Sequence, residues 1–222
     1  MKLSLVSRIV GWVALPALVI AVAALGTGGC ASKKAESQLA KEKEDLSEYR
    51  EAAADALRAA TTTLESFNRT ASEHPCPPKV LETFVNDIQQ LEVDSFKMRE
   101  RAQAMKAVGE VYFQQWHDHL AAIDDPVARK LAVERHDALL ESFHKIHQLS
   151  LQTREAFGPY ISGLHRFRNA LETDPNAAAS DTLKNTIPAT RENGQKVVDG
   201  LTAILQELKA DWAILKPVKS NT

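Results

Sequence analysis

The sequence predicts an all-α protein, an elongated antiparallel helical bundle or coiled coil of about four long helices after an N-terminal signal segment. Three observations predict this class. Strong helix formers such as Ala, Leu, Glu, Lys and Arg dominate the 222 residues. Aromatic residues make up only 6%, with 9 Gly and 9 Pro, which argues against a β-sandwich or barrel. Apolar residues also recur in steps of three and four over long stretches, as in helices that pack on one another.

The first 29 residues have the order of a secretory signal peptide. Lys2 and Arg8 precede an apolar run over residues 10–25, and small residues then lead to Cys30. The run is shorter than the roughly 20 residues that a membrane-spanning helix needs. We therefore expect residues 1–29 to be removed on export.

Cys30 resembles the cysteine of a bacterial lipobox. Gly28 and Gly29 are the small residues expected before it, whereas Thr27 stands where Leu is usual. The resemblance implies cleavage before Cys30 and acylation, for example with palmitate, and each buried methylene contributes about 0.8 kcal/mol to anchoring. Ala31, rather than Asp, follows the cysteine, which favours an outer-membrane lipoprotein facing the periplasm. An ordinary signal cleavage giving a soluble periplasmic protein and an uncleaved inner-membrane anchor remain as alternatives.

The mature chain divides into a membrane-proximal segment (30–44), a helical bundle domain (45–217) and a tail (218–222). The first apolar seam of the bundle comprises Leu46, Tyr49, Ala53, Ala56, Ala60, Leu64 and Phe67. This helix must stop before Pro75-Cys76-Pro77-Pro78, because proline lacks the backbone donor that a helix needs.

The second seam is the longest. It comprises Leu81, Phe84, Ile88, Leu91, Ser95, Met98, Ala102, Met105, Gly109, Tyr112, Trp116, His119 and Ile123. A repeat held for about six heptads predicts a left-handed supercoil. Ser95 and Gly109 are gaps in the seam where a partner or a closer helix crossing would fit. Asp125 is the expected N-cap of the next helix, with Pro126 at its first position.

Two further seams complete the bundle. The third comprises Leu131, Leu139, Phe143, Ile146, Leu149, Thr153, Phe157, Tyr160, Leu164, Phe167 and Leu171. Gly158-Pro159 should kink or break this helix, and Asp174-Pro175-Asn176 opens a loop. The fourth comprises Leu183, Ile187, Thr190, Val197, Leu201, Ile204, Leu208, Trp212 and Leu215, with Pro188 near its start and Pro217 past its end. Short connections predict an up-down arrangement of neighbouring helices.

One motif has the spacing of a metal site. Glu141-x-x-His144, with His147 nearby, matches the Glu-x-x-His pairs of di-metal helical bundles, which place both ligands on one helix face. Such sites need a second copy, and the sequence has none. Because Phe143 and Ile146 occupy the apolar seam, Glu141 and His144 should face solvent. The favoured interpretation is a solvated helix face with no metal and no cofactor.

Two other residues carry specific predictions. His119 falls on the second seam, so we expect a core histidine held by a hydrogen bond. His117 cannot chelate a metal with it, because residues two apart point to different sides of a helix. Cys76 has no partner if Cys30 is acylated, and its Pro-rich loop should be exposed. It would then form an intermolecular disulfide or remain a buried thiol, whereas an unmodified Cys30 would allow a Cys30–Cys76 bond.

Residues 108–212 carry a resemblance to a known family. The residues that carry it are Tyr112-Phe113-x-x-Trp116, Asp124-Asp125, Arg129, Phe157-x-Pro159, Leu164 to Leu171 and Leu183-Lys184. This half of the chain resembles the uncharacterised bacterial family catalogued as domain of unknown function 2959. The chain departs from the family at Arg168-Asn169-Ala170 and in a longer loop at 174–176. The resemblance implies a periplasmic helical lipoprotein and supplies no activity.

These observations favour a non-enzymatic, lipid-anchored helical protein that acts through protein–protein contact, self-association or envelope structure. The chain has 27 Lys and Arg against 29 Asp and Glu and no basic stripe, which argues against a nucleic-acid partner. A small-molecule sensor or carrier with a site between helices is the alternative, and a cavity lined by His119, Tyr112 and Trp116 would favour it. A metal-binding bundle built on Glu141, His144 and His147 is the second alternative.

Overall fold

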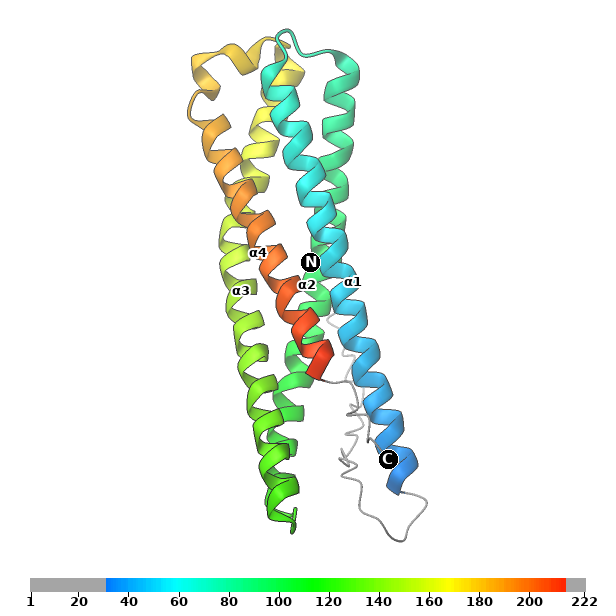
Figure 1. Cartoon of the computed structure of the whole chain (residues 1–222). Helices are drawn as coiled ribbons and strands as arrows, with labels where there is room; N and C mark the ends of the chain where they lie inside the picture. Colours follow the sequence, from blue (N-terminus) through cyan, green and yellow to red (C-terminus); the bar gives the residue numbers. More distant parts are fainter. Residues whose placement is uncertain (1–30, 215–222) are drawn as a thin grey trace, which may run out of the picture.

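The computed structural model of the chain describes residues 31–214 and confirms the all-α prediction. It contains four long helices: α1 (Ala31–Ser72), α2 (Pro78–Leu120), α3 (Pro126–Thr173) and α4 (Thr186–Ile214) (Figure 1). Two short 3-10 helices, η1 (Ala177–Ala179) and η2 (Asp181–Leu183), lie between α3 and α4. No strand is found within residues 31–214. The signal segment, Cys30 and the 218–222 tail lie outside the described residues.

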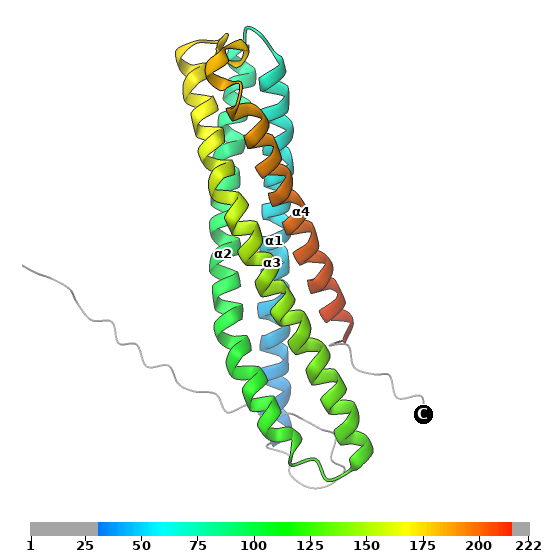
Figure 2. The same ribbon diagram turned by 90° about the vertical axis from the view of Figure 1, so that its left-hand side faces the viewer.

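The helices alternate up and down, and α1 and α3 each pack against both α2 and α4 (Figure 2). A polar contact joins each adjacent pair: Glu48–Arg101 (2.6 Å), Glu92–His165 (2.9 Å), Lys145–Glu207 (2.5 Å) and Asn68–Arg191 (2.7 Å). Such exposed contacts add about 0–1 kcal/mol each to stability. They nevertheless define the order of the helices around a closed bundle.

The predicted seams form the core. On α1, Ala53, Ala56 and Ala60 are fully buried, and their small side chains allow close approach of the neighbouring helices. Phe67, Phe84 and Phe167 bring three helices together, with ring centroids 4.9 to 6.1 Å apart. Burial of each ring contributes about 1.5–3 kcal/mol, so this cluster is a main source of cohesion between α1, α2 and α3.

The two ends of the bundle differ. At one end, here called the loop end, the α1–α2 and α3–α4 connections meet, and the Cys76 N–H donates to the Pro175 carbonyl at 2.8 Å. At the other end, called the tip, the turn at 121–125 joins α2 to α3. The Asp125 side chain accepts from the Val127 N–H at 3.0 Å, which confirms the predicted N-cap before Pro126.

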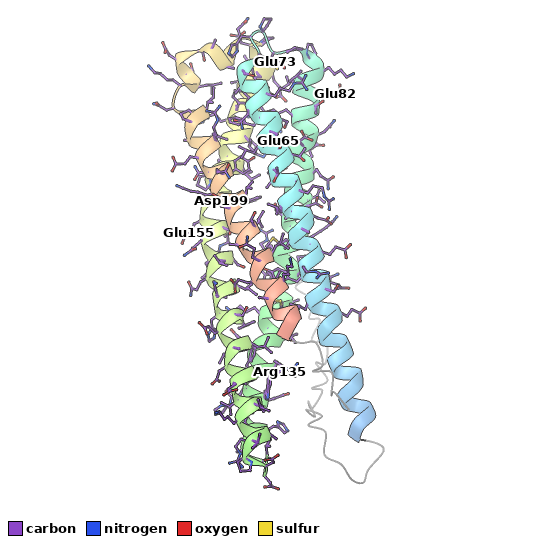
Figure 3. All side chains as sticks on the ribbon, in the orientation of Figure 1. Glu65, Glu73, Glu82, Arg135, Glu155 and Asp199 are labelled. Atoms are coloured by element: carbon purple, nitrogen blue, oxygen red, sulfur yellow. The ribbon has the colours of Figure 1, made fainter. Side chains whose placement is uncertain are left out.

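Near the tip, α2 and α3 extend beyond the end of α4 (Figures 1 and 2). A second apolar cluster, separate from the main core, lies there between the two helices and is built on Trp116, Leu120 and Leu139. Charged side chains cover the outside of the bundle, as Glu65, Glu82, Glu155 and Asp199 illustrate in Figure 3. Within residues 31–214, no helix combines the length and apolarity needed to cross a membrane.

Some details of the predicted helices differ from the structure. Of the kink or break expected at Gly158-Pro159, a break does not occur, since α3 continues through Pro159. Helix α1 includes residues 31–44, the stretch assigned to the membrane-proximal segment. Leu183 lies in η2, so the last helix starts three residues later than the apolar spacing indicated. Leu131 is 61% exposed rather than part of a seam, because α3 packs on the tip cluster through Ala132, Val133 and Leu139 instead.

Candidate functional site

A cavity opens between α2 and α3, and two contacts between these helices mark its ends. Toward the loop end, His165 Nε2 lies 2.9 Å from Glu92 Oε1. Toward the tip, Gly109 packs so tightly under the Phe143 ring that a Cβ atom at position 109 would overlap the ring. Between these contacts, the small residues Ser95 and Ala102 occupy seam positions of α2. The helix faces therefore do not fill the space between them, which leaves a cavity of about 800 Å³. We call it the α2–α3 groove.

The walls of the groove are largely apolar. The apolar residues that line it on α2 and α3 include Phe96, Met98, Ala102, Met105, Phe143, Ile146, Leu151, Phe157 and Ile161. The floor comes from the other two helices, through Tyr49, Ala56, Val197, Leu201 and Ile204. All four helices therefore contribute, and the groove reaches the centre of the bundle.

The floor contains one polar group, the Tyr49 hydroxyl. It lies 3.4 Å from Ser150 Oγ, and Ser150 in turn donates to the Ile146 carbonyl at 2.8 Å. Since the Ser150 proton is used in that second bond, Tyr49 donates to Ser150. Burial raises the pKa of Tyr49, while the hydrogen bond with Ser150 lowers it in part. Tyr49 is therefore a neutral polar group at the base of an apolar site.

The mouth of the groove is cationic. Arg99 and Lys106 line it from α2, Arg154 lines it from α3, and the acidic Glu92 is engaged with His165. The Arg99 guanidinium lies 5.2 Å from the centroid of the Phe96 ring, and this ring is 51% exposed. Lys106 pairs with an acid on its own helix. Arg99 and Arg154 form no salt bridge with any residue that the structure describes.

The three residues expected to line a cavity do not line the groove. Tyr112 and Trp116 belong to the tip cluster, and their ring centroids are 5.5 Å apart. His119 is exposed, with its Nδ1 2.6 Å from the Gln115 carbonyl oxygen, so its predicted place in the core was wrong.

The buried histidine near the tip is instead His136, which is 4% exposed. Its ring packs edge-on against Trp116, and its Nδ1 lies 2.9 Å from Asp137 Oδ1 and its Nε2 3.3 Å from the Phe113 carbonyl oxygen. The sequence held a signal for it. The series Ala132, His136, Leu139, Phe143 and Ile146 continues the third seam toward the tip in steps of four and three.

The residues of the metal motif do not converge. Glu141 and His144 are exposed, as their phase relative to the apolar seam predicted, whereas His147 borders the groove. Within the described part of the chain, no group of three or more His, Cys, Asp or Glu side chains is arranged to hold a metal ion.

Cys76 is buried, at 5% exposure, so the expected exposure of this loop position was wrong and the alternative of a buried thiol is confirmed. The α3–α4 connection covers it through the hydrogen bond to Pro175. Burial and the nearby Glu73 carboxylate raise the pKa of the thiol, and a backbone hydrogen bond from Leu81 lowers it in part. Both causes of the rise favour an unreactive, protonated thiol.

Comparison with protein-family models, with curated proteins and with solved structures found no match. The resemblance to the uncharacterised lipoprotein-like family therefore stays a prediction, and the function has to be inferred from the groove.

Proposed function

We propose that this chain is a non-enzymatic carrier or sensor that binds an apolar small molecule in the α2–α3 groove. In this proposal a lipid on Cys30 anchors the protein in the bacterial cell envelope, facing the periplasm. One observation carries the proposal, namely a largely apolar cavity of about 800 Å³ that reaches the core of an otherwise closed bundle. Ligand pockets in proteins are typically about 300–1,000 Å³ and mostly apolar with few polar groups, and helical bundles commonly hold ligands between facing helices.

Packing physics supports a ligand at this place. The groove opens to solvent at its mouth, so water covers its apolar walls, and displacing this water contributes about 25 cal/mol per Å² of apolar surface buried. Met98, Ile146 and Ile204, which line it, are buried residues of the helix seams. An apolar molecule would cover these walls, and the floor hydroxyl of Tyr49 would give it one orienting partner.

A pair of alanines allows a matched test of the binding site. Ala102 lines the groove, whereas Ala138, on α3, is exposed and does not line it. We expect the mature chain to bind the neutral fluorophore N-phenyl-1-naphthylamine saturably and to melt at a higher temperature in its presence. Ala102→Phe should abolish both effects, and Ala138→Phe should leave them intact. Equal behaviour of the two variants, or no saturable binding by wild type, would count against the proposal.

The lipid anchor needs a separate experiment. The intact mass of protein extracted from host membranes should correspond to a chain that begins at Cys30 and carries acyl chains. A Cys30→Ala change should remove this species. A mature chain that begins upstream of Cys30, or an uncleaved chain, would reject the lipoprotein assignment while leaving ligand binding to be tested on its own.

Protein–protein contact is a second candidate function, and the outer face of α2 favours it. Val93, Lys97, Glu100, Ala104 and Val111 are exposed and follow one another on this face at helical spacing. In an antiparallel pair of α2 helices, Val93 would face Ala104 and Lys97 would face Glu100. This self-complementary pattern indicates a second copy of the chain as the partner.

Sedimentation equilibrium tests this candidate. We expect a concentration-dependent dimer that Val93→Asp together with Val111→Asp disrupts. Val127→Asp, at an exposed valine near the tip, serves as the control and should not affect it. A wild-type chain that stays monomeric at high concentration would exclude self-association through α2.

A further inference from the structure

The charge at the mouth of the groove differs from that of the whole chain. The chain has a formal net charge of -2. The residues that line the groove include three Arg and Lys side chains against one acid, and this acid, Glu92, is already paired with His165. An apolar cavity with a cationic mouth is suited to a molecule with an apolar body and an anionic end.

The two unpaired guanidinium groups stand on opposite walls at a similar height. Arg99 lies 10 residues before Gly109 on α2, and Arg154 lies 11 residues after Phe143 on α3. Because the two helices run antiparallel and Gly109 contacts Phe143, these counts place both arginines within about one turn of each other along the bundle axis. One anionic group at the mouth is therefore within the reach of both long side chains.

Arginine suits such a group for geometric reasons. Its planar guanidinium can donate two parallel hydrogen bonds to a carboxylate or a phosphate, and it stacks on aromatic rings. The Arg99 guanidinium already lies over the Phe96 ring, at the edge of the groove. Neither Arg99 nor Arg154 has an acidic partner among the described residues, so neither would have to break a salt bridge to bind an anion.

The rest of the groove suits a chain-like apolar body. Phe96, Phe157 and Ile161 line the part between the arginines and the Glu92–His165 contact. From Ser95 to Met105 the α2 wall spans about 15 Å at 1.5 Å per residue. The groove is thus elongated along the bundle axis, with apolar walls and its free positive charge at the mouth.

We propose that the ligand is a single-chain anionic amphiphile, whose acyl or alkyl chain lies in the α2–α3 groove and whose carboxylate or phosphate is held by Arg99 and Arg154. This inference rests on the proposed function, because it names the ligand class of the same groove. It assigns no catalytic role to either arginine. Both are binding residues for the head group.

Displacement of N-phenyl-1-naphthylamine from the mature chain tests the head-group preference. The competitors are dodecanoate and dodecyl phosphate, each below its micellar concentration, and dodecanol below its solubility limit. The two anions should bind at least about tenfold more tightly than the alcohol, because each charge-assisted hydrogen bond favours the anion. The tighter of the two anions identifies the head group, and the preference should weaken at high salt.

Variants then assign the preference to the arginines. Arg99→Gln combined with Arg154→Gln should reduce the preference for the anions to less than about threefold without changing dodecanol binding. The control removes two charges elsewhere, by Arg58→Gln with Arg166→Gln, at exposed residues that do not line the groove. It should leave the preference unchanged.

The outcomes separate the two proposals. If dodecanol binds wild type as tightly as the anions do, or if the control lowers the preference as much as the arginine variant, the anionic ligand class is wrong while a ligand groove remains supported. If neither the neutral fluorophore nor any dodecyl compound binds, the proposed function itself fails.

Discussion

Gly109 of α2 lies directly under the ring of Phe143 of α3, in a space that a Cβ atom would have to share with the ring. This contact draws the two helices together and closes the α2–α3 groove toward the tip. A glycine inside a helix costs about 0.5–1 kcal/mol relative to alanine, so its presence here is explained by packing rather than by helix formation.

We therefore predict that Gly109→Ala destabilises the protein by about 1–3 kcal/mol in urea unfolding, because overpacking outweighs the gain in helix propensity. Phe143→Leu removes the ring that the new methyl group would meet. In that background Gly109→Ala should lower the free energy of unfolding only slightly, or raise it, and a double-mutant cycle measures this coupling between the two positions. An equal loss of stability in both backgrounds would show that overlap with the Phe143 ring is not its cause.

The contrast between Gly109 and Ser95 shows how far the sequence could lead. Apolar periodicity is a local property, and it predicted the helices, their order and most buried positions. A small residue in a seam, however, has two structural outcomes. At Gly109 a neighbouring ring fills the gap, whereas at Ser95 the gap becomes part of a cavity. The outcome depends on which residues of α3 lie at the same height, and the register between helices is a tertiary property.

His119 shows a second limit to predicting buried residues from the apolar spacing of the sequence. A seam drawn strictly at 3.5 residues per turn drifts by about 20° per heptad from a straight helix with 3.6 residues per turn. Over the length of α2 the drift moves the buried face by one residue, so Leu120 is buried where His119 was expected. The same stretch of the bundle buries His136 of α3, which the predicted seam had missed by starting from Leu131.

The two histidines should therefore respond differently to substitution. His136→Ala removes a ring that packs on Trp116 and the contacts of both ring nitrogens, and we expect a loss of about 2–4 kcal/mol. His119→Ala, at an exposed position, should change stability by less than about 0.5 kcal/mol. Urea unfolding followed by circular dichroism measures both, and similar losses would contradict the burial of His136.

Tyr160 offers a stabilising substitution. Its ring is fully buried, yet its hydroxyl oxygen has no hydrogen-bond partner among the described residues. A buried polar atom without a partner costs about 1–3 kcal/mol, so Tyr160→Phe should raise the free energy of unfolding by about 1 kcal/mol. Tyr49→Phe is the matched control and should lower it, because that hydroxyl bonds to Ser150. A loss of stability in Tyr160→Phe would reveal a partner for the hydroxyl.

The same residue predicts a pH dependence. Burial raises the pKa of Tyr160 well above the ordinary value of 10.0. Above pH 10 the unfolded chain ionises this phenol while the folded chain keeps it neutral, so stability present below pH 10 is lost as pH rises. The loss can reach about 1.4 kcal/mol per pH unit for one such group. The free energy of unfolding, measured from pH 8 to 11, should fall less steeply above pH 10 in Tyr160→Phe than in wild type. Parallel curves for the two proteins would contradict this assignment.

Cys76 should resist modification in the native protein. Its side chain is covered at the loop end, and both burial and Glu73 raise the thiol pKa, which lowers the fraction of reactive thiolate at pH 8. In a Cys30→Ala chain we expect a thiol reagent to react with Cys76 at least about tenfold more slowly than in denaturant, and mild oxidation to give no disulfide-linked dimer. A chain carrying Cys30→Ala, Cys76→Ala and Ser72→Cys provides an exposed thiol at the end of α1 and should react rapidly. Rapid native labelling of Cys76, or a dimer formed through it, would mean that the α3–α4 connection opens readily and would restore the intermolecular disulfide that the sequence had suggested.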